Sequence, residues 1–185
     1  MTSMTKVAIM LAVKQDLSIQ RRTHYTINEL THSVQVSRST LYYHFHGGLP
    51  ETFNFTFQQE ILVPIQVHQL DWPATVRFLL RYIAQHQMLV KNMYALSDWH
   101  EFMAIQPALA QTLLNNYDQF GKTTNSVVLL AQLQMLCSAL LFELQLWLLD
   151  NFDEDWHLIQ QRVAVFDQNL ANPATLSKNC TLSAK

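Results

Sequence analysis

Five side chains that can donate hydrogen bonds to a nucleic acid follow one another closely after Ser37. An arginine fork can bond phosphate oxygens or the edge of guanine, and hydroxyl and phenol groups can bond a sugar-phosphate backbone. These residues therefore suggest DNA binding by a short helix that directs them away from the protein. They are Arg38, Ser39, Thr40, Tyr42 and Tyr43.

A helix that begins after Thr26 would hold this polar helix in place. Thr26 is a good N-cap residue and Glu29 follows three positions later, which is the capping-box arrangement. Ile27, Leu30 and Val34 then recur at helical intervals and form one apolar face. We expect this first helix of the pair to end near Val34.

The second helix of the pair begins with Ser37 as its N-cap, about four residues after the first ends. Leu41 and Phe45 lie four residues apart on the side that we expect to be buried. The apolar run that follows Lys6 predicts one more helix, which would support the pair. Residues 1–48 are therefore predicted to form a three-helix domain with a helix-turn-helix motif.

The run VSRSTLYYHF, preceded by TINELTHSV, resembles the DNA-binding motif of the TetR/AcrR family of transcriptional regulators. The resemblance covers residues 5–57 and implies a dimeric regulator, most often a repressor that a small molecule releases from a palindromic operator. A disulfide between Cys137 and Cys180 is not expected, so the cytoplasm is the expected location. By the family analogy Arg38, Ser39 and Tyr43 correspond to base-reading positions. Thr26, Thr40, Tyr42 and His44 correspond to phosphate-contacting or structural positions, and Tyr42 and His44 can equally be packing residues.

Two positions depart from the family pattern. Gln35 stands where the family commonly has glycine in the turn, so it must adopt a left-handed conformation or the turn must bend differently. Gly48 stands where the family usually has a lysine that contacts a phosphate. The loss of that charge weakens binding. A TetR-fold adaptor that acts through protein partners, with weak or lost DNA binding, is therefore the alternative function.

Composition and charge agree with a helical regulator. Only three glycines occur among the 185 residues, which is fewer than the tight turns of a β-sheet protein would need. The predicted fold is therefore all-α. Residues 1–50 carry five Lys or Arg against two Asp or Glu, and the rest carries seven against twelve. A mildly basic end on an acidic body suits a DNA-binding protein. The sequence shows no metal-ligand spacing, cofactor motif or catalytic set, so we expect neither an enzyme nor a bound cofactor.

Residues 49–172 are predicted to form a helical ligand-sensing and dimerisation domain, and residues 173–185 a disordered tail. Pro64 should kink or end the helix that follows Gly48, and Pro73 should start another whose apolar face continues to Tyr94. We expect a short helix over 98–104, and then one that Pro107 opens and Gly121 ends.

The family resemblance implies a small-molecule cavity among the middle helices. Aromatic and methionine residues at helical spacing could line it, although they are more often ordinary core. A ligand there would be largely apolar or aromatic, because few charged groups converge. The candidates are Phe78, Tyr82, Met88, Trp99, Phe102, Met103 and Tyr117.

The segment from Val127 to Leu149 is apolar nearly all round. We expect no membrane span, because Glu143 and nearby glutamines would be costly in lipid and the flank is acidic. Such a helix must be covered on more than one side, and the next helix repeats at seam spacing. This favours a homodimer, although an intramolecular core explains the seam nearly as well. The candidate interface residues are Leu140, Leu144, Trp147, Trp156, Ile159, Val163 and Phe166.

Overall fold

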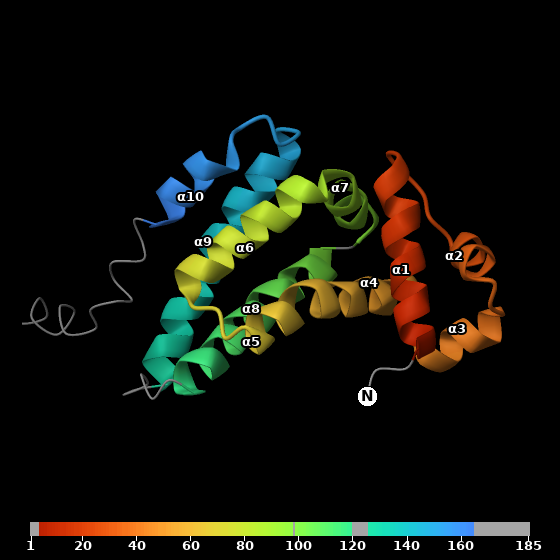
Figure 1. Cartoon of the computed structure of the whole chain (residues 1–185), viewed down its shortest axis with the longest axis horizontal. Coiled ribbons are helices and arrows are strands. Elements are labelled where there is room, and N and C mark those ends of the chain that lie inside the picture. The colour runs from red at the N-terminus through yellow and green to blue at the C-terminus, as the bar shows by residue number, and fades with distance from the viewer. Residues whose placement is uncertain (1–3, 98, 120–125, 165–185) are drawn as a thin grey trace, which may run out of the picture.

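The computed structural model describes residues 4–97, 99–119 and 126–164, and it describes side chains within these ranges except at 99–103 and 119. Every regular element in these ranges is a helix, so the all-α prediction is confirmed. A head lies at one end of the molecule and a helical body at the other (Figure 1). The head consists of α1 (Met4–Ile19), α2 (Ile27–Val34) and α3 (Arg38–His44).

The body follows Gly48. Helix α4 runs from the head into the body and continues through η1, a π-helical segment, into α5 (Figure 1). The elements are α4 (Leu49–Phe57), η1 (Gln58–Leu62), α5 (Val63–Val67), α6 (Trp72–Gln85), α7 (Gln87–Leu96), α8 (Trp99–Gln119), α9 (Ser126–Leu149) and α10 (Trp156–Ala164).

Three helix boundaries differ from the prediction, at Pro64, His86 and Pro107. Pro64 does not end the helix, because it follows the π-helical segment η1 directly and lies in the first turn of α5. The apolar face predicted to run to Tyr94 is broken at His86, where φ is −125° and ψ is 35°. Pro107 lies inside one continuous helix, α8, instead of opening a new one. Gly121 and the tail lie outside the described residues.

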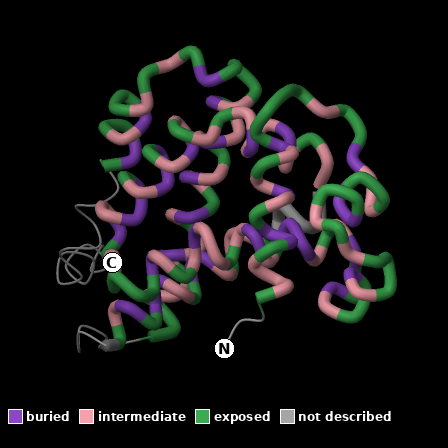
Figure 2. Tube along the Cα trace, turned by 45° about the vertical axis from the view of Figure 1, so that its right-hand side comes forward, coloured by how far each residue is buried: buried purple, intermediate pink, exposed green. Residues whose placement is uncertain are grey.

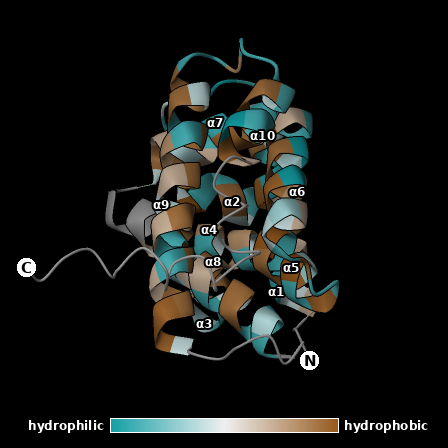
Figure 3. Ribbon diagram, turned by 90° about the vertical axis from the view of Figure 1, so that its left-hand side faces the viewer, coloured by the Kyte–Doolittle hydropathy of each residue, from teal (hydrophilic) through white to brown (hydrophobic). Residues whose placement is uncertain are grey.

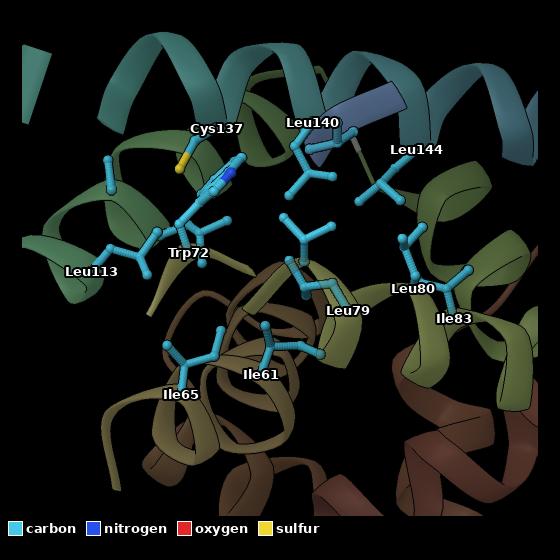
Figure 4. Packing of buried hydrophobic residues seen from close by; sticks show 14 of the residues in the cluster. Ile61, Ile65, Trp72, Leu79, Leu80, Ile83, Leu113, Cys137, Leu140 and Leu144 are labelled. Atoms are coloured by element: carbon cyan, nitrogen blue, oxygen red, sulfur yellow. The ribbon is translucent and has the colours of Figure 1, made fainter. Parts of the chain in front are cut away.

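The body is held together by a hydrophobic core between α6, α8 and α9. Figure 4 shows Leu140 and Leu144 of α9 pointing toward the side chains of α6, with Trp72 beside Cys137. Trp72 is 1% exposed and Leu113 and Cys137 are fully buried, so the centre of the body is tightly covered. Figure 2 shows buried residues along the inward faces of these helices.

The head has a core of its own. Leu30, Leu41 and Phe45 are fully buried in it, as predicted from their spacing, together with residues of α1. This core also takes in Phe53 from α4 and Leu89 from α7. Two body helices therefore complete the apolar interior of the head.

Helix α7 is joined to the end of α1 by a buried amide. The Asn92 side chain donates hydrogen bonds to the carbonyl oxygens of Leu17 (2.8 Å) and Gln20 (2.7 Å), and its Oδ1 accepts one from the Arg22 N–H (2.8 Å). These bonds satisfy backbone groups that the end of a helix leaves without partners. The head is thus fixed to the body through α7 as well as through α4.

Candidate nucleic-acid interface

The start of α2 is fixed by the predicted capping box. The Thr26 hydroxyl accepts a hydrogen bond from the Glu29 N–H at 3.2 Å, and Glu29 Oε2 accepts one from the Thr26 N–H at 2.8 Å. The Thr26 hydroxyl also donates to this carboxylate. These hydrogen bonds from Thr26 lower the pKa of Glu29 below its ordinary value. The sequence prediction of this helix start is confirmed.

The turn between α2 and α3 depends on Gln35. Its φ is 59° and its ψ is 42°, the left-handed conformation predicted as one of two possibilities. The Gln35 N–H donates to the His32 carbonyl, and the Val36 N–H donates to the Thr31 carbonyl. These two bonds cap the end of α2 and set the direction in which α3 leaves the turn.

Ser37 starts α3 as expected. Its hydroxyl accepts a hydrogen bond from the Thr40 N–H at 3.0 Å, and its backbone is extended. Ser37 Oγ also lies 2.7 Å from Ser39 Oγ and 2.8 Å from Thr40 Oγ1. The buried Leu41 anchors the helix to the head core, so its polar residues are held on the outside.

The side chains on the outer face of α3 are exposed to solvent. Tyr43 is 75% exposed and Tyr42 is 44% exposed, and Arg38 and Ser39 are exposed as well. His44 is half-buried and its ring meets that of Tyr43 edge to face at 5.0 Å. The exposed face of α3 therefore carries a guanidinium, a hydroxyl and two phenols.

Two surface hollows lie along α2 and α3. One of about 340 Å³ brings together Thr26, Arg38 and Tyr42 with two residues of α2, Ile27 and Asn28. The other, of about 550 Å³, lies beside Asn28 and is also lined by Thr31, His32, Gln35 and Val36. Asn28 lines both hollows, although the sequence analysis did not single it out. Its place two residues after the N-cap, on the polar side of α2, was the available signal.

Gly48 is required by the backbone at the start of α4. Its φ is 69° and its ψ is −136°, a conformation that side chains oppose. A Cβ at this position would lie 3.2 Å from Ile27 Cδ1. A lysine, or any other side chain, would therefore be strained at this position.

Most of the basic side chains of the head are engaged within the protein. Arg22 pairs with Glu29 at 3.0 Å and Lys14 with Glu60 at 2.6 Å. The Lys6 ammonium lies 5.0 Å from the centre of the Phe45 ring, and Arg21 donates to a backbone carbonyl. Arg38 is the basic residue that α3 itself presents.

The candidate effector residues are distributed around the body. Phe78, Tyr82 and Tyr117 are half-buried and pack against the body core. The Tyr82 hydroxyl donates to Glu60 Oε2 at 3.3 Å, and burial together with the Glu60 charge raises the pKa of Tyr82. Met88 is also half-buried, and the side chains of Trp99, Phe102 and Met103 lie outside the described part. Both hollows described above lie on the head, away from these residues.

The candidate dimer residues are mostly inside one subunit. Trp156 is half-buried against the same core, and Phe166 lies outside the described residues. Within one subunit these side chains close the body core, as the intramolecular interpretation expects, and their role in a dimer stays a prediction. The buried residues are Leu140, Leu144, Trp147, Ile159 and Val163.

The opposite side of α9 carries exposed apolar side chains. Met135 is 74% exposed and Phe142 is 59% exposed, and Figure 3 shows hydrophobic residues along this outer side. Among the described helices, α9 is the one that is long and apolar enough to cross a membrane. We call this set of residues the α9 stripe: Val127, Val128, Met135, Phe142, Leu146 and Leu149.

The fold is that of an all-helical protein whose helix-turn-helix head is carried on a helical body. Neither a family model nor a curated protein matches the chain. It is similar to a solved structure described as "Dihydroxyacetone kinase operon activator DhaS", with a TM-score of 0.62 and 15% sequence identity. The match covers 91% of this chain and 96% of that one, so the likeness in fold extends over nearly the whole of both chains.

Proposed function

We propose that this protein is a DNA-binding transcription regulator of the TetR type that acts in the cytoplasm. The exposed polar face of α3 carries the proposal, because the buried Leu41 anchors the helix to the head core while its hydrogen-bond donors stay exposed. Arg38, Ser39 and Tyr43 would read bases, and Thr26, Thr40, Tyr42 and His44 would contact phosphates or support the helix. The fold shared with a protein described as an operon activator supports this function.

The regulator would act as a homodimer that forms through the α9 stripe. Six exposed apolar side chains lie along this helix, and burying them against a second copy would remove them from water. This interface differs from the one predicted from the seam, because the seam residues are used inside the subunit. Two copies would place their α3 helices about one helical turn of DNA apart, roughly 34 Å or slightly more, and read a palindromic operator.

A small apolar or aromatic effector would control this regulator. The protein would be a repressor that leaves its DNA site when the effector binds. Binding of the effector near Phe78, Tyr82 and Tyr117 would shift the population of body conformations. Helix α4 would carry that shift to the head, since it starts at Gly48 and places Phe53 in the head core.

A regulatory adaptor is the second candidate. The engagement of Lys6, Lys14, Arg21 and Arg22 within the protein favours it, because few free cations remain to contact phosphates. Such a protein would bind DNA weakly and with little sequence preference, and would act through a protein partner. The two functions therefore differ in how binding depends on salt and on sequence.

Selection of bound sequences from a random DNA pool tests the regulator. We expect recovery of a palindrome, and we expect Arg38→Ala and Tyr43→Ala each to weaken binding to it at least tenfold. Arg77→Ala, which removes an exposed arginine of α6, is the matched control and should leave binding unchanged. Recovery of no common sequence, with the same weak affinity for every variant, would favour the adaptor.

Sedimentation equilibrium tests the dimer surface. We expect the wild type to sediment as a dimer and the double variant Met135→Asp, Phe142→Asp to sediment as a monomer that keeps its helical circular dichroism. Val67→Asp, at an exposed apolar residue of α5, is the control and should remain dimeric. A double variant that stays dimeric would contradict the α9 stripe as the interface.

A further inference from the structure

Asn28 of α2 holds the one arginine of α3. The Arg38 Nε–H donates a hydrogen bond to Asn28 Oδ1, and the two atoms lie 2.5 Å apart. Both side chains are exposed, so burial of an apolar surface does not explain their contact. The bond joins the two helices of the motif at the surface where DNA would lie.

This bond fixes the orientation of the guanidinium. A free arginine side chain loses rotamer entropy when it binds, and its planar fork is useful only in one orientation. With Nε held by Asn28, the two Nη groups remain to donate in a known plane. Two parallel N–H donors match the O6 and N7 acceptors of guanine in the major groove.

The position of Asn28 is itself fixed. It follows the Thr26–Glu29 capping box in the first turn of α2, so its backbone cannot move independently of that cap. Arg38 and Tyr42 line the same hollow as Asn28. The amide of Asn28, the guanidinium of Arg38 and the phenol of Tyr42 thus form one surface.

We propose that Asn28 is a positioning residue that orients Arg38 toward a G·C base pair, and that specificity at this base pair depends on Asn28. The inference rests on the proposed DNA-binding function and adds to it the base pair and the residue that sets its recognition. A residue that merely touches a phosphate would lower affinity equally for every sequence. Asn28 instead acts through Arg38.

A double-mutant cycle on the selected DNA site tests this inference. Binding is measured for the wild type, Asn28→Ala, Arg38→Ala and the double variant, on the selected site and on sites with the G·C pair replaced by A·T. We expect Asn28→Ala to lower affinity about tenfold for the selected site alone. In the Arg38→Ala background, Asn28→Ala should have no further effect, because the residue that it orients is gone.

Two further variants separate positioning from general damage. Asn28→Asp keeps the acceptor oxygen and should keep the preference for G·C, while its added charge lowers affinity for all DNA. Asn54→Ala, at an exposed asparagine of α4, should change neither affinity nor preference. The Arg38 Nε–H resonance, followed by NMR in the free protein, should exchange slowly in the wild type and Asn28→Asp and rapidly in Asn28→Leu.

The outcomes are distinct. Additive losses in the cycle, an unchanged preference in Asn28→Ala, or an Nε–H exchange rate that Asn28→Leu does not change would overturn the role of Asn28 while leaving the regulator function intact. If the wild type selects no sequence, the proposed function fails and this inference fails with it.

Discussion

The Lys14 ammonium lies 2.6 Å from Glu60 Oε2, and this ion pair joins α1 of the head to the π-helical segment η1. The same carboxylate oxygen accepts a hydrogen bond from the Tyr82 hydroxyl of α6 at 3.3 Å. Three parts of the fold therefore meet at Glu60: the head, the helix that leaves it and the body. Any movement of η1 relative to α6 would change the contacts of Lys14.

Breaking this ion pair should cost measurable stability. The Lys14 and Glu60 side chains are 23% and 21% exposed, so each charge loses part of its hydration. We expect Lys14→Met and Glu60→Gln each to lower the free energy of unfolding by about 1 kcal/mol. The double variant should lose less free energy of unfolding than the sum of the two single losses. Urea unfolding of the four proteins measures these losses. Fully additive costs would mean that the two groups do not interact in solution.

Asn92 should be one of the most sensitive polar residues. Its fully buried side chain makes three hydrogen bonds to the backbone between Leu17 and Arg22. Asn92→Leu leaves those groups without partners and should lower the free energy of unfolding by about 3 kcal/mol. Denaturant unfolding measures this loss.

The control for Asn92 is Asn115→Leu on α8, at an exposed asparagine. A surface substitution of this kind should change stability by about 0.5 kcal/mol or less. Equal effects of the two variants would contradict the role of Asn92 in joining α7 to α1.

Gln35→Gly should stabilise the protein. The φ of Gln35 is 59°, a left-handed conformation that glycine adopts without steric cost. We expect a gain of about 1 kcal/mol in the free energy of unfolding, with DNA binding retained. Gln15→Gly in the middle of α1 is the matched control and should lose about 1 kcal/mol. A loss of stability in Gln35→Gly would show that the Gln35 side chain contributes more than its backbone strain costs.

The capping box should make stability depend on pH in the acidic range. Hydrogen bonds from Thr26 lower the pKa of Glu29 below its ordinary 4.5, so the folded state favours the ionised carboxylate. This stabilisation is present above pH 4.5 and is lost as the pH falls through the lowered pKa of the folded state.

Glu29→Gln tests this dependence because it keeps the side-chain length and removes the charge. We expect the wild type to exceed the variant in unfolding free energy at neutral pH, and the difference to shrink as the pH falls below 4.5. Thr26→Ala, which removes the hydroxyl, should show a weaker pH dependence than the wild type. A wild-type advantage that grows toward acid would refute the assignment.

Features whose interacting groups lie within a few residues of each other could be predicted from the sequence alone. The Thr26–Glu29 capping box and the Ser37 cap follow from hydrogen bonds inside one turn, whereas the left-handed Gln35 was one of two possibilities that the sequence left open. The spacing of Leu30 and Leu41 likewise predicted the buried sides of α2 and α3. Such interactions are local, so they can be derived from the order of residues alone.

Which side of each body helix is buried depends on how the helices pack against one another. Helix α9 is apolar nearly all round, so its pattern could not show that Leu144 faces the core while Phe142 is left exposed. Likewise, the bonds from Asn92 to α1 and from Arg38 to Asn28 join residues on different helices. Their formation depends on how the helices pack, because a contact between distant residues requires the whole chain to fold around it.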